Sequence, residues 1–136
     1  MTYKFIIAGP AQPQEAPGVR RAGKFNIIYD PKKTAQFKNY VKMCCSQQWG
    51  DRAPLEGPLE MKLLFNFLKP KSMSKKVRFH AKKPDIKNLL AALEDGMKKI
   101  VFRDDSQICK TLIEKQYANV ANTVVFLTEL DKEDIT

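Results

Sequence analysis

The sequence predicts an α+β fold: a single small domain in which a mixed or antiparallel sheet packs with two main helices. Some segments alternate apolar and polar residues, as strands do, whereas others repeat apolar residues at helical spacing. The predicted order is two strands, a helix, a strand, a helix and two strands. The 136 residues contain no internal repeat or linker, so we expect one domain over residues 1–136 with a modest core.

The N-terminal part is predicted to contain two short strands joined by a loop. Tyr3–Ala8 and Phe25–Tyr29 have the apolar and aromatic composition of strands. Gly9–Gly23 lies between them and is expected to be a loop, because it is rich in proline and glycine. The basic residues of this loop are Arg20 and Arg21.

The first predicted helix follows directly. Asp30 and Pro31 are expected to open it, since an aspartate side chain caps free N–H groups and proline fits the first turn. Gly50 is expected to end it. Apolar residues at helical spacing predict a buried face made up of Phe37, Tyr40, Val41 and Cys44.

The second half is predicted to contain three strands and one helix. Leu59–Leu68 is expected to be a long strand. The residues on its buried face are expected to be Leu59, Met61, Leu63, Phe65 and Phe67. A helix begins near Asp85, which is placed as its N-cap. The stripe that it buries is expected to consist of Ile86, Leu89, Leu90, Leu93, Met97 and Ile100. Ile108–Tyr117 and Thr123–Leu130 are the last two strands, with Val120–Asn122 in or near their hairpin turn.

Positive charge is the clearest functional indication in the composition. The formal net charge of +9 favours nucleic acid or another anionic surface as a partner. Part of it lies in Lys69–Lys83, a stretch without a carboxylate in which Phe79 and His80 are interleaved. Its basic residues are Lys69, Lys71, Lys75, Lys76, Arg78, Lys82 and Lys83. The alternative is a solvated surface segment, but so many bases without an acidic partner favour an element that contacts phosphates of DNA or RNA.

Apolar runs and cysteines indicate the cellular location, and several other residues are expected to have structural roles. No apolar run has the length of a membrane span, and the apolar stretch at the N-terminus is too short for a signal peptide. The cysteines are Cys44, Cys45 and Cys109. Their odd number and their spacing argue against disulfides and zinc, so we expect packing thiols in a reducing cytoplasm. His80 is expected to be structural, Trp49 and Phe102 are expected in the core or an interface, and the acidic tail from Asp131 is expected to be frayed.

Acidic residues at both ends of the second predicted helix suggest metal chemistry. Asp85 lies at its start, and Asp104 and Asp105 lie in the loop after its end. Carboxylates beside a dense positive field suggest a divalent metal held against a polyanion, as in a nuclease. A helix of about a dozen residues is roughly 18 Å long. Acids at its two ends can therefore share a metal within one subunit only if the loop folds back, or if Asp105 pairs with the next strand beside the end of the helix that carries Asp85. The alternative is that these acids form an N-cap and a solvated turn.

Two motifs around these acids resemble those of the RusA family of Holliday-junction resolvases. They are Lys83-Pro84-Asp85-Ile86 and, further along, Arg103-Asp104-Asp105-Ser106-Gln107-Ile108. Weaker similarity extends through the Ile7-Ala8-Gly9-Pro10 turn, Tyr29–Thr34, Lys69–Ser72 and Ser74–Lys76. The resemblance implies a small dimeric, magnesium-dependent endodeoxyribonuclease that resolves four-way DNA junctions in recombination and repair. Such proteins are common in bacterial phages and prophages.

The resemblance also implies roles for particular residues. Asp85 matches the family's first catalytic aspartate, and Asp105 and Asp104 match acids near the far end of the helix. The implied catalytic residues are Asp85, Asp105 and Asp104, and the implied metal ligands are Asp85, Asp105 and Asp95. They would hold Mg²⁺ (or Mn²⁺), which activates water for in-line attack on a phosphodiester. The family gathers its carboxylates from separate elements, which implies that the loop or strand after the helix folds back. A homodimer matches the two-fold symmetry of a junction that needs two nicks.

Three places depart from the family pattern. Lys87 stands where a second aspartate is usual, and Ala91 stands where a lysine is usual. Gln14–Gly18, which includes Ala16, replaces a segment with a basic residue before Pro-Arg. Exchanging a carboxylate for an ammonium opposes divalent-metal binding, and losing the lysine removes a phosphate contact. The hypotheses are therefore a resolvase impaired at Lys87 and Ala91, or a non-catalytic protein that binds DNA junctions. An RNA-binding module rests on charge alone.

Overall fold

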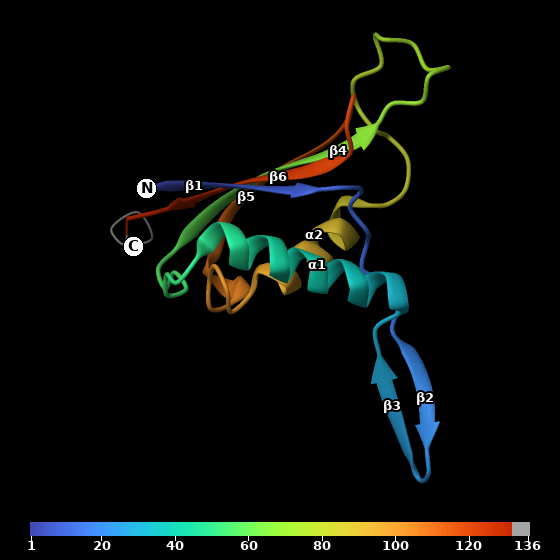
Figure 1. Cartoon of the computed structure of the whole chain (residues 1–136), viewed down its shortest axis with the longest axis vertical. Coiled ribbons are helices and arrows are strands. Elements are labelled where there is room, and N and C mark those ends of the chain that lie inside the picture. The colour runs from blue at the N-terminus through green and yellow to red at the C-terminus, as the bar shows by residue number, and fades with distance from the viewer. Residues whose placement is uncertain (132–136) are drawn as a thin grey trace.

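Four strands form one mixed sheet, and a separate pair of strands forms a projecting hairpin (Figure 1). The computed structural model describes residues 1–131, so most of the predicted acidic tail lies outside the described residues. The elements are β1 Thr2–Ala8, β2 Gly18–Ala22, β3 Phe25–Tyr29, α1 Lys32–Trp49, β4 Leu59–Leu68, α2 Ile86–Met97, the short 3₁₀ helix η1 Asp105–Gln107, β5 Ile108–Ala118 and β6 Asn122–Glu129. The predicted α+β class with two main helices is confirmed.

The order of strands in the sheet decides where the ends of α2 lie. The order is β1-β6-β4-β5, in which β6 runs antiparallel to β1 and β4, and β5 runs parallel to β4. The helix α2 belongs to the crossover that joins the two parallel strands. Figure 1 shows α1 and α2 on the same side of the sheet. Because β5 starts beside Leu59, the first residue of β4, α2 ends near the start of β4 and begins near its end.

The core lies between the sheet and the two helices. Alternate residues of β4 are buried, as predicted: Leu59, Met61, Leu63 and Phe65. Phe67 is partly buried and packs against them. The helices contribute Phe37, Val41, Cys44, Leu89, Leu93 and Met97. Trp49 and Phe102 are also buried, which confirms their predicted place in the core.

The buried faces of both helices differ in part from the predicted ones. Tyr40 on α1 and Ile86 on α2 are exposed, and Ile100 follows the end of α2. Ala92 and Gly96 are buried instead. The reason is a close approach of the helices: a Cβ atom on Gly96 would lie 2.6 Å from the side chain of Val41. Small residues therefore face α1, and the buried stripe of α2 is rotated toward them.

The two ends of α1 are formed in different ways. Gly50 ends the helix as predicted, with a φ of 73° that favours glycine and an N–H that donates to the carbonyl of Ser46. The predicted cap at the start is wrong, because Pro31 occupies the N-cap position and no side chain caps the helix. The carboxylate of Asp30 instead accepts hydrogen bonds from Gln14 and Lys38.

The predicted hairpin between the last two strands is not formed. Both strands and the turn between them exist, but β4 lies between β5 and β6 and pairs with both. Asn66 of β4 is aligned with Gln116 of β5 on one side and with Asn122 of β6 on the other. The turn therefore passes around the end of β4. Inserting β4 buries its alternating apolar face in the middle of the sheet, which a β5–β6 pair would leave at an edge.

The second half of the predicted N-terminal loop is a strand. Gly18–Ala22 pairs antiparallel with β3, and Gly23 and Lys24 connect the two strands. The loop prediction was wrong here because proline and glycine lie before the strand and in its turn, with Gly23 at a φ of 61°. The β2–β3 hairpin, residues 18–29, projects away from the sheet and helices (Figure 1). We call it the arm.

Three side-chain amides form a row across the sheet. The amide of Asn66 on β4 donates to Asn122 on β6 at 2.7 Å and accepts from Gln116 on β5 at 2.9 Å. These residues are aligned in the strand register, so the hydrogen bonds run from strand to strand. The row lies close to the end of β4, where the chain leaves the sheet toward the basic stretch.

The expectations about membrane spans and cysteines can be compared with the structure. None of the helices within residues 1–131 is both long enough and apolar enough to cross a bilayer. The three cysteines are free, and Cys44 and Cys45 are buried as packing residues. Cys109 is exposed on β5, so its predicted packing role is wrong.

Candidate nucleic-acid and metal site

Among the described residues 1–131, the carboxylate of Asp85 at the start of α2 has no hydrogen-bond or ion-pair partner. Asp85 occupies the N-cap position, as predicted, but its side chain makes no capping hydrogen bond. It lines an open pocket of about 550 Å³ together with Lys83, Pro84, Asn88 and residues 11–16. A carboxylate that is not used to cap its own helix is available for another partner. This observation favours a functional role for Asp85 over the alternative of a simple cap.

The segment Gln12–Ala16, which lines the other side of this pocket, is fixed by hydrogen bonds. The N–H of Gln14 donates to the carbonyl of Asn88 at 2.8 Å, which joins the segment to the first turn of α2. The buried hydroxyl of Thr34 donates to the carbonyl of Pro13 and accepts from the N–H of Glu15, each at 3.2 Å. The segment that departs from the family pattern is therefore an ordered wall of the pocket.

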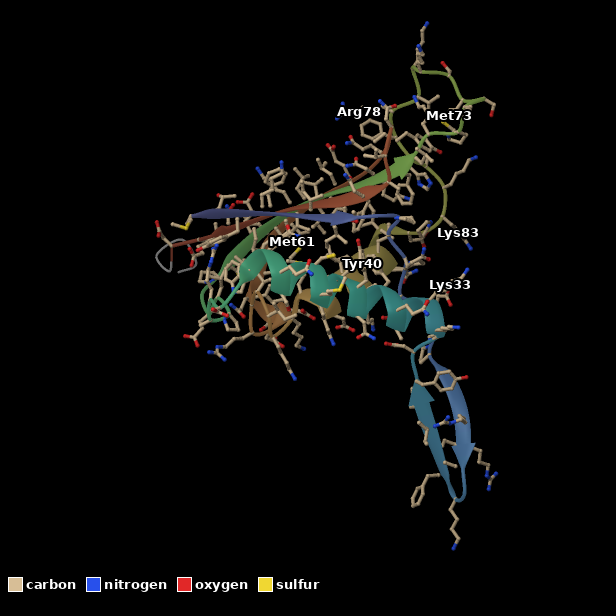
Figure 2. All side chains as sticks on the ribbon, in the orientation of Figure 1. Lys33, Tyr40, Met61, Met73, Arg78 and Lys83 are labelled. Carbon is tan, nitrogen blue, oxygen red and sulfur yellow. The ribbon has the colours of Figure 1, made fainter. Side chains whose placement is uncertain are left out.

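The stretch Lys69–Lys83, which we call the basic loop, leads from β4 to Asp85. It projects from the sheet, with Met73 and Arg78 far from the helices (Figure 2). Its basic side chains are largely exposed, and Arg78 is the one that forms an ion pair within the described part of the chain, at 3.6 Å from Glu114. This exposed, unneutralised charge is suited to contact phosphates. The stretch is a loop and not a helix, with turns and one short bridge between Phe79 and Gln116, so the predicted alternative of a solvated surface segment is left in the form of a loop.

Two contacts hold the end of the basic loop against the sheet. The ammonium of Lys115 on β5 donates to the carbonyl of Lys82 at 2.6 Å and to that of Pro84 at 2.9 Å. The ring of His80 stacks on Phe67, with centroids 3.8 Å apart, and it also packs against Tyr117. Burial lowers the pKa of His80, and Lys115 and Lys82 lower it further. His80 is thus a packed, uncharged ring near neutral pH, in line with its predicted structural role.

A second group of acids lies at the other end of α2. Asp104 caps η1 by accepting from the N–H of Ser106, and Gln107 completes the capping box. These hydrogen bonds, together with Lys98 at 3.2 Å, lower the pKa of Asp104 to about 2. Asp104 is therefore an ionised cap with a cation beside it, which matches the predicted alternative of a structural turn.

Glu94 and Asp105 are crowded carboxylates beside this cap. Burial raises the pKa of Glu94 to about 7, and the charges of Asp105 and Asp95 add to the effect. Burial likewise raises the pKa of Asp105, against the opposing influence of Lys98, and one oxygen of Asp105 is buried without a hydrogen-bond partner. Carboxylates that resist ionisation at close quarters are the kind of group that a divalent cation stabilises. Asp95 already lies 2.8 Å from Lys38.

The structure does not bring Asp85 and Asp105 together within one chain. Asp85 precedes α2, which has 12 residues and is about 18 Å long, and Asp105 follows the helix. Along β5, Ile108 follows η1, whereas Lys115, which contacts Pro84, lies seven residues further on, roughly 23 Å away. The implied fold-back of the loop or strand is therefore absent. The strand β5 runs parallel to β4 and starts beside the first residue of β4, at the end of the sheet opposite to Asp85. In residues 1–131 no three carboxylate, histidine or cysteine side chains are placed to hold one metal ion.

The two departures on α2 lie close to Asp85. Lys87 and Ala91 are both exposed, and they are four residues apart, which places them on one face of the helix. Nothing covers this face in the part of the chain that the structure describes, so a larger side chain at position 91 would meet solvent.

The fold and these motifs define a known class of protein. Residues 8–128 match the family described as Endodeoxyribonuclease RusA, and the chain belongs to that family. Its members are nucleases that bind and resolve branched DNA junctions and generally depend on a divalent metal. The chain is also similar to the uncharacterized protein YqaN of Bacillus subtilis (strain 168). The two are 30% identical over 138 residues, which cover 93% of this chain and 96% of that protein.

Two residues of this region were missed by reasoning from the sequence. Glu94 was overlooked because it stands next to Asp95, which the family pattern emphasises. Its place on the half-buried side of α2 was the available signal. Lys38 was overlooked because nothing in the spacing along α1 shows that it reaches both Asp30 and Asp95.

Proposed function

We propose that this protein is a magnesium-dependent endodeoxyribonuclease that binds and resolves four-way DNA junctions. The observation that carries the proposal is the free carboxylate of Asp85, held in an open pocket directly after the basic loop. The basic loop, which ends at Lys83, would bind phosphates beside the scissile bond, while Asp85 faces that bond. The residues proposed for catalysis are Asp85 and Asp105; Asp104, which the resemblance also implies, is already used as the cap of η1.

The distance between Asp85 and Asp105 supports a site that is shared between two subunits. One chain holds Asp85 at the start of α2, whereas Glu94 follows nine residues later, about 14 Å along the helix axis, with Asp105 beside it. In a two-fold symmetric homodimer, the start of α2 from each subunit can face the end of α2 from its partner. Two such sites would form, which is the number that symmetric cleavage of a junction requires.

A shared site also accounts for the state of the acids in one chain. Asp105 has an oxygen without a partner, and Glu94 has a raised pKa, so the two can provide carboxylate oxygens to a hard cation. A third carboxylate would come from the other subunit. When bound, Mg²⁺ (or Mn²⁺) would activate a water molecule and neutralise the phosphate charge. Asp95 is a weaker candidate ligand than the resemblance implies, because Lys38 already neutralises it.

A specific observation favours a second candidate, a junction-binding protein with little or no cleavage activity. Lys87 places an exposed ammonium two residues after Asp85, where it competes with a metal for that carboxylate. The basic loop does not depend on this position. DNA binding would therefore survive even where metal binding is weak.

We include in this proposal the cellular location and the origin of the protein. The free thiols of Cys44 and Cys45 and the bacterial relative support action in a bacterial cytoplasm, and the resemblance supports a phage or prophage origin.

The test is an assay of the unmodified protein on a labelled four-way junction. Binding and cleavage are measured with magnesium, with manganese and with a chelator, against a linear duplex of the same sequence. Paired, metal-dependent nicks near the branch point that Asp85→Asn abolishes would support the resolvase. Selective binding without nicks would support the second candidate, and equal binding to junction and duplex without nicks would overturn both.

A further inference from the structure

The arm carries positive charge without any carboxylate. Residues 18–29 include Arg20, Arg21 and Lys24 and no acidic residue. We propose that the arm is a second DNA-contacting element, which enters a groove of the duplex on the side of the Asp85 pocket opposite the basic loop. The proposal rests on the proposed function only in taking DNA as the polyanion, and it does not depend on cleavage.

The arm is exposed to a degree that a hairpin rarely tolerates alone. Its side chains at Val19, Phe25 and Ile28 are 63%, 75% and 72% exposed. An isolated two-stranded hairpin is marginally stable in water, and exposed apolar side chains add nothing to its stability. A surface that covers the arm would stabilise it. The question is therefore which surface suits its charge and shape.

The distribution of side chains on the arm suits a groove with two walls. Arg20 and Arg21 are neighbours in β2, so they project from opposite faces of the ribbon. Arg20 shares its face with Ile27, and Arg21 shares the other face with Asn26 and Ile28. A five-residue ribbon is about 17 Å long, and the major groove, about 12 Å wide, admits a two-stranded ribbon. In that position each arginine reaches the phosphates of one wall.

The position of the arm relative to Asp85 supports the same inference. The arm and the basic loop project at opposite ends of the longest axis of the molecule (Figure 1). Lys33, at the start of α1, and Lys83, at the end of the basic loop, lie between these two projections (Figure 2). Asp85 follows Lys83 by two residues and lines the pocket there. A duplex that reaches Asp85 would thus meet positive charge on both sides.

The base of the arm is fixed relative to α2. The amide of Gln14 donates to Asp30, which follows β3, and the N–H of Gln14 donates to Asn88, three residues after Asp85. The ring of Tyr29 covers Gly18 so closely that a Cβ atom there would lie 2.4 Å from it. These contacts give the arm a defined direction from the pocket, so its contacts with DNA would help to place the scissile phosphate.

A second copy of the chain is the other possible occupant of the arm. It is disfavoured by charge, because the chain as a whole carries +9 and the arm would bring three more positive charges to it. A protein surface that covers one face of the ribbon would also leave the arginine and the apolar side chains of the other face in water. Measurement of the oligomeric state separates the two occupants.

The experiment compares the unmodified protein with Arg20→Gln/Arg21→Gln/Lys24→Gln. Glutamine keeps a polar side chain of similar length, and circular dichroism and thermal unfolding check the fold. Binding of a labelled four-way junction and of a linear duplex is measured over a range of salt, and the oligomeric state by sedimentation. The matched control is Lys62→Gln/Lys110→Gln, two exposed lysines on β4 and β5.

We expect the arm variant to bind both DNAs about tenfold or more weakly, with a salt slope shallower by about 2.7, or 0.9 for each of three lost phosphate contacts. The control should keep the wild-type slope, and sedimentation should be unchanged. An unchanged affinity and slope would overturn the proposal, as would loss of the dimer with DNA binding intact. If the unmodified protein shows no preference for junctions, the proposed function fails, while the duplex data still decide the role of the arm. If it binds neither DNA, both fail.

Discussion

Nζ of Lys38 on α1 lies 2.8 Å from Oδ2 of Asp95 on α2. The same ammonium lies 2.9 Å from Asp30, which follows the arm, and the lysine side chain is only 12% exposed. The hydrogen bond from Lys38 is the main cause of the lowered pKa of Asp30. One cation therefore holds α1, α2 and the base of the arm together.

Replacing Lys38 should lower the stability of the protein, because Lys38 connects α1, α2 and the base of the arm. Lys38→Met keeps most of the apolar length but leaves two carboxylates without their cation. Charge-assisted hydrogen bonds contribute about 1.5–3 kcal/mol, and partial exposure of both acids reduces this, so we expect a loss of about 1–2 kcal/mol in the free energy of unfolding by urea. The control is Lys42→Met, one turn further along α1, where the lysine is exposed. Equal stability of the two variants would show that the bridge contributes nothing.

The raised pKa of Glu94 predicts a loss of stability as the pH rises. The folded protein holds a proton on Glu94 up to about pH 7, whereas the unfolded chain releases it near the ordinary value of 4.5. Stability from this group is therefore complete below that value and is lost as the pH rises through about 7. Glu94→Gln should flatten the change between about pH 4.5 and pH 8 by roughly 1 kcal/mol, after allowance for partial exposure.

The same measurement also reports on metal binding. If Glu94 and Asp105 hold a divalent cation, magnesium should restore stability above pH 7 in the unmodified protein and not in Glu94→Gln. Glu60→Gln on β4 serves as the control for loss of one carboxylate. A pH profile that magnesium leaves unchanged would argue against these acids as ligands.

A shared active site predicts complementation between inactive subunits. Asp85→Asn and Asp105→Asn homodimers should each fail to cut. After mixing and subunit exchange, half of the dimers should be mixed, and each mixed dimer should carry one intact site made of Asp85 from one subunit and Asp105 from the other. We expect nicking of one strand to return, to about a quarter of the wild-type number of sites.

The outcome distinguishes a shared site from a site within one chain. In the latter case every site in a mixed dimer lacks one carboxylate, and mixing restores nothing. The experiment requires a dimer, so sedimentation at micromolar concentration comes first. A monomer that still cuts junctions symmetrically would contradict this view of the assembly.

Restoring the residues usual in the family should raise cleavage. Lys87→Asp returns a carboxylate near Asp85 and removes a competing cation, and Ala91→Lys returns a positive group one turn along the same face. A charged group in such a site contributes roughly 3 kcal/mol, so the double variant should cut faster by one to several powers of ten with magnesium. Lys87→Ala separates removal of the cation from gain of the ligand. Full-speed cleavage by the unmodified protein would mean that Lys87 and Ala91 are not lesions.

Charge reversal in the basic loop should weaken DNA binding without regard to sequence. Lys75→Glu/Lys76→Glu removes two exposed phosphate contacts, so the salt slope should fall by about 1.8, or 0.9 for each contact. Junctions of different sequence should be affected alike, since phosphate contacts carry no base information. If affinity and slope are unaltered, the loop is a solvated surface and the DNA-binding surface lies elsewhere.

The parts of the fold that the sequence predicted depend on local patterns. Alternation along Leu59–Leu68 predicted the buried face of β4, and Gly50 marked the end of α1, because each signal acts within a few residues. The partner of a strand is not a local property. Ile108–Ala118 and Asn122–Glu129 are joined by a short turn, which favours a hairpin, yet β4 lies between them because its apolar face gains more burial at the centre of the sheet.

For the candidate site as well, the sequence predicted local features and missed those that depend on strand pairing. The sequence predicted that Asp85 lies directly beside the basic loop, because both belong to one segment of the chain. It located β3 of the arm but not β2, since the residues of β2 are largely exposed and stand beside proline and glycine. It also did not separate the two ends of α2, because the direction of β5 depends on pairing with β4. The pKa of Glu94 is raised by burial and by the charge of Asp105; its place on the half-buried side of α2 indicates the burial, but the approach of Asp105 depends on the fold.

The amide row of Gln116, Asn66 and Asn122 has a consequence for strand alignment. A slide of β4 by two residues would keep every apolar side chain on its own face, so hydrophobic burial alone hardly opposes it. Such slippage would part the amides from their partners, at a cost of about 1–3 kcal/mol for each group left unpaired. The row therefore singles out one alignment among several of similar burial. Because the basic loop starts three residues after Asn66, that alignment also sets how far the loop's lysines reach beyond the edge of the sheet.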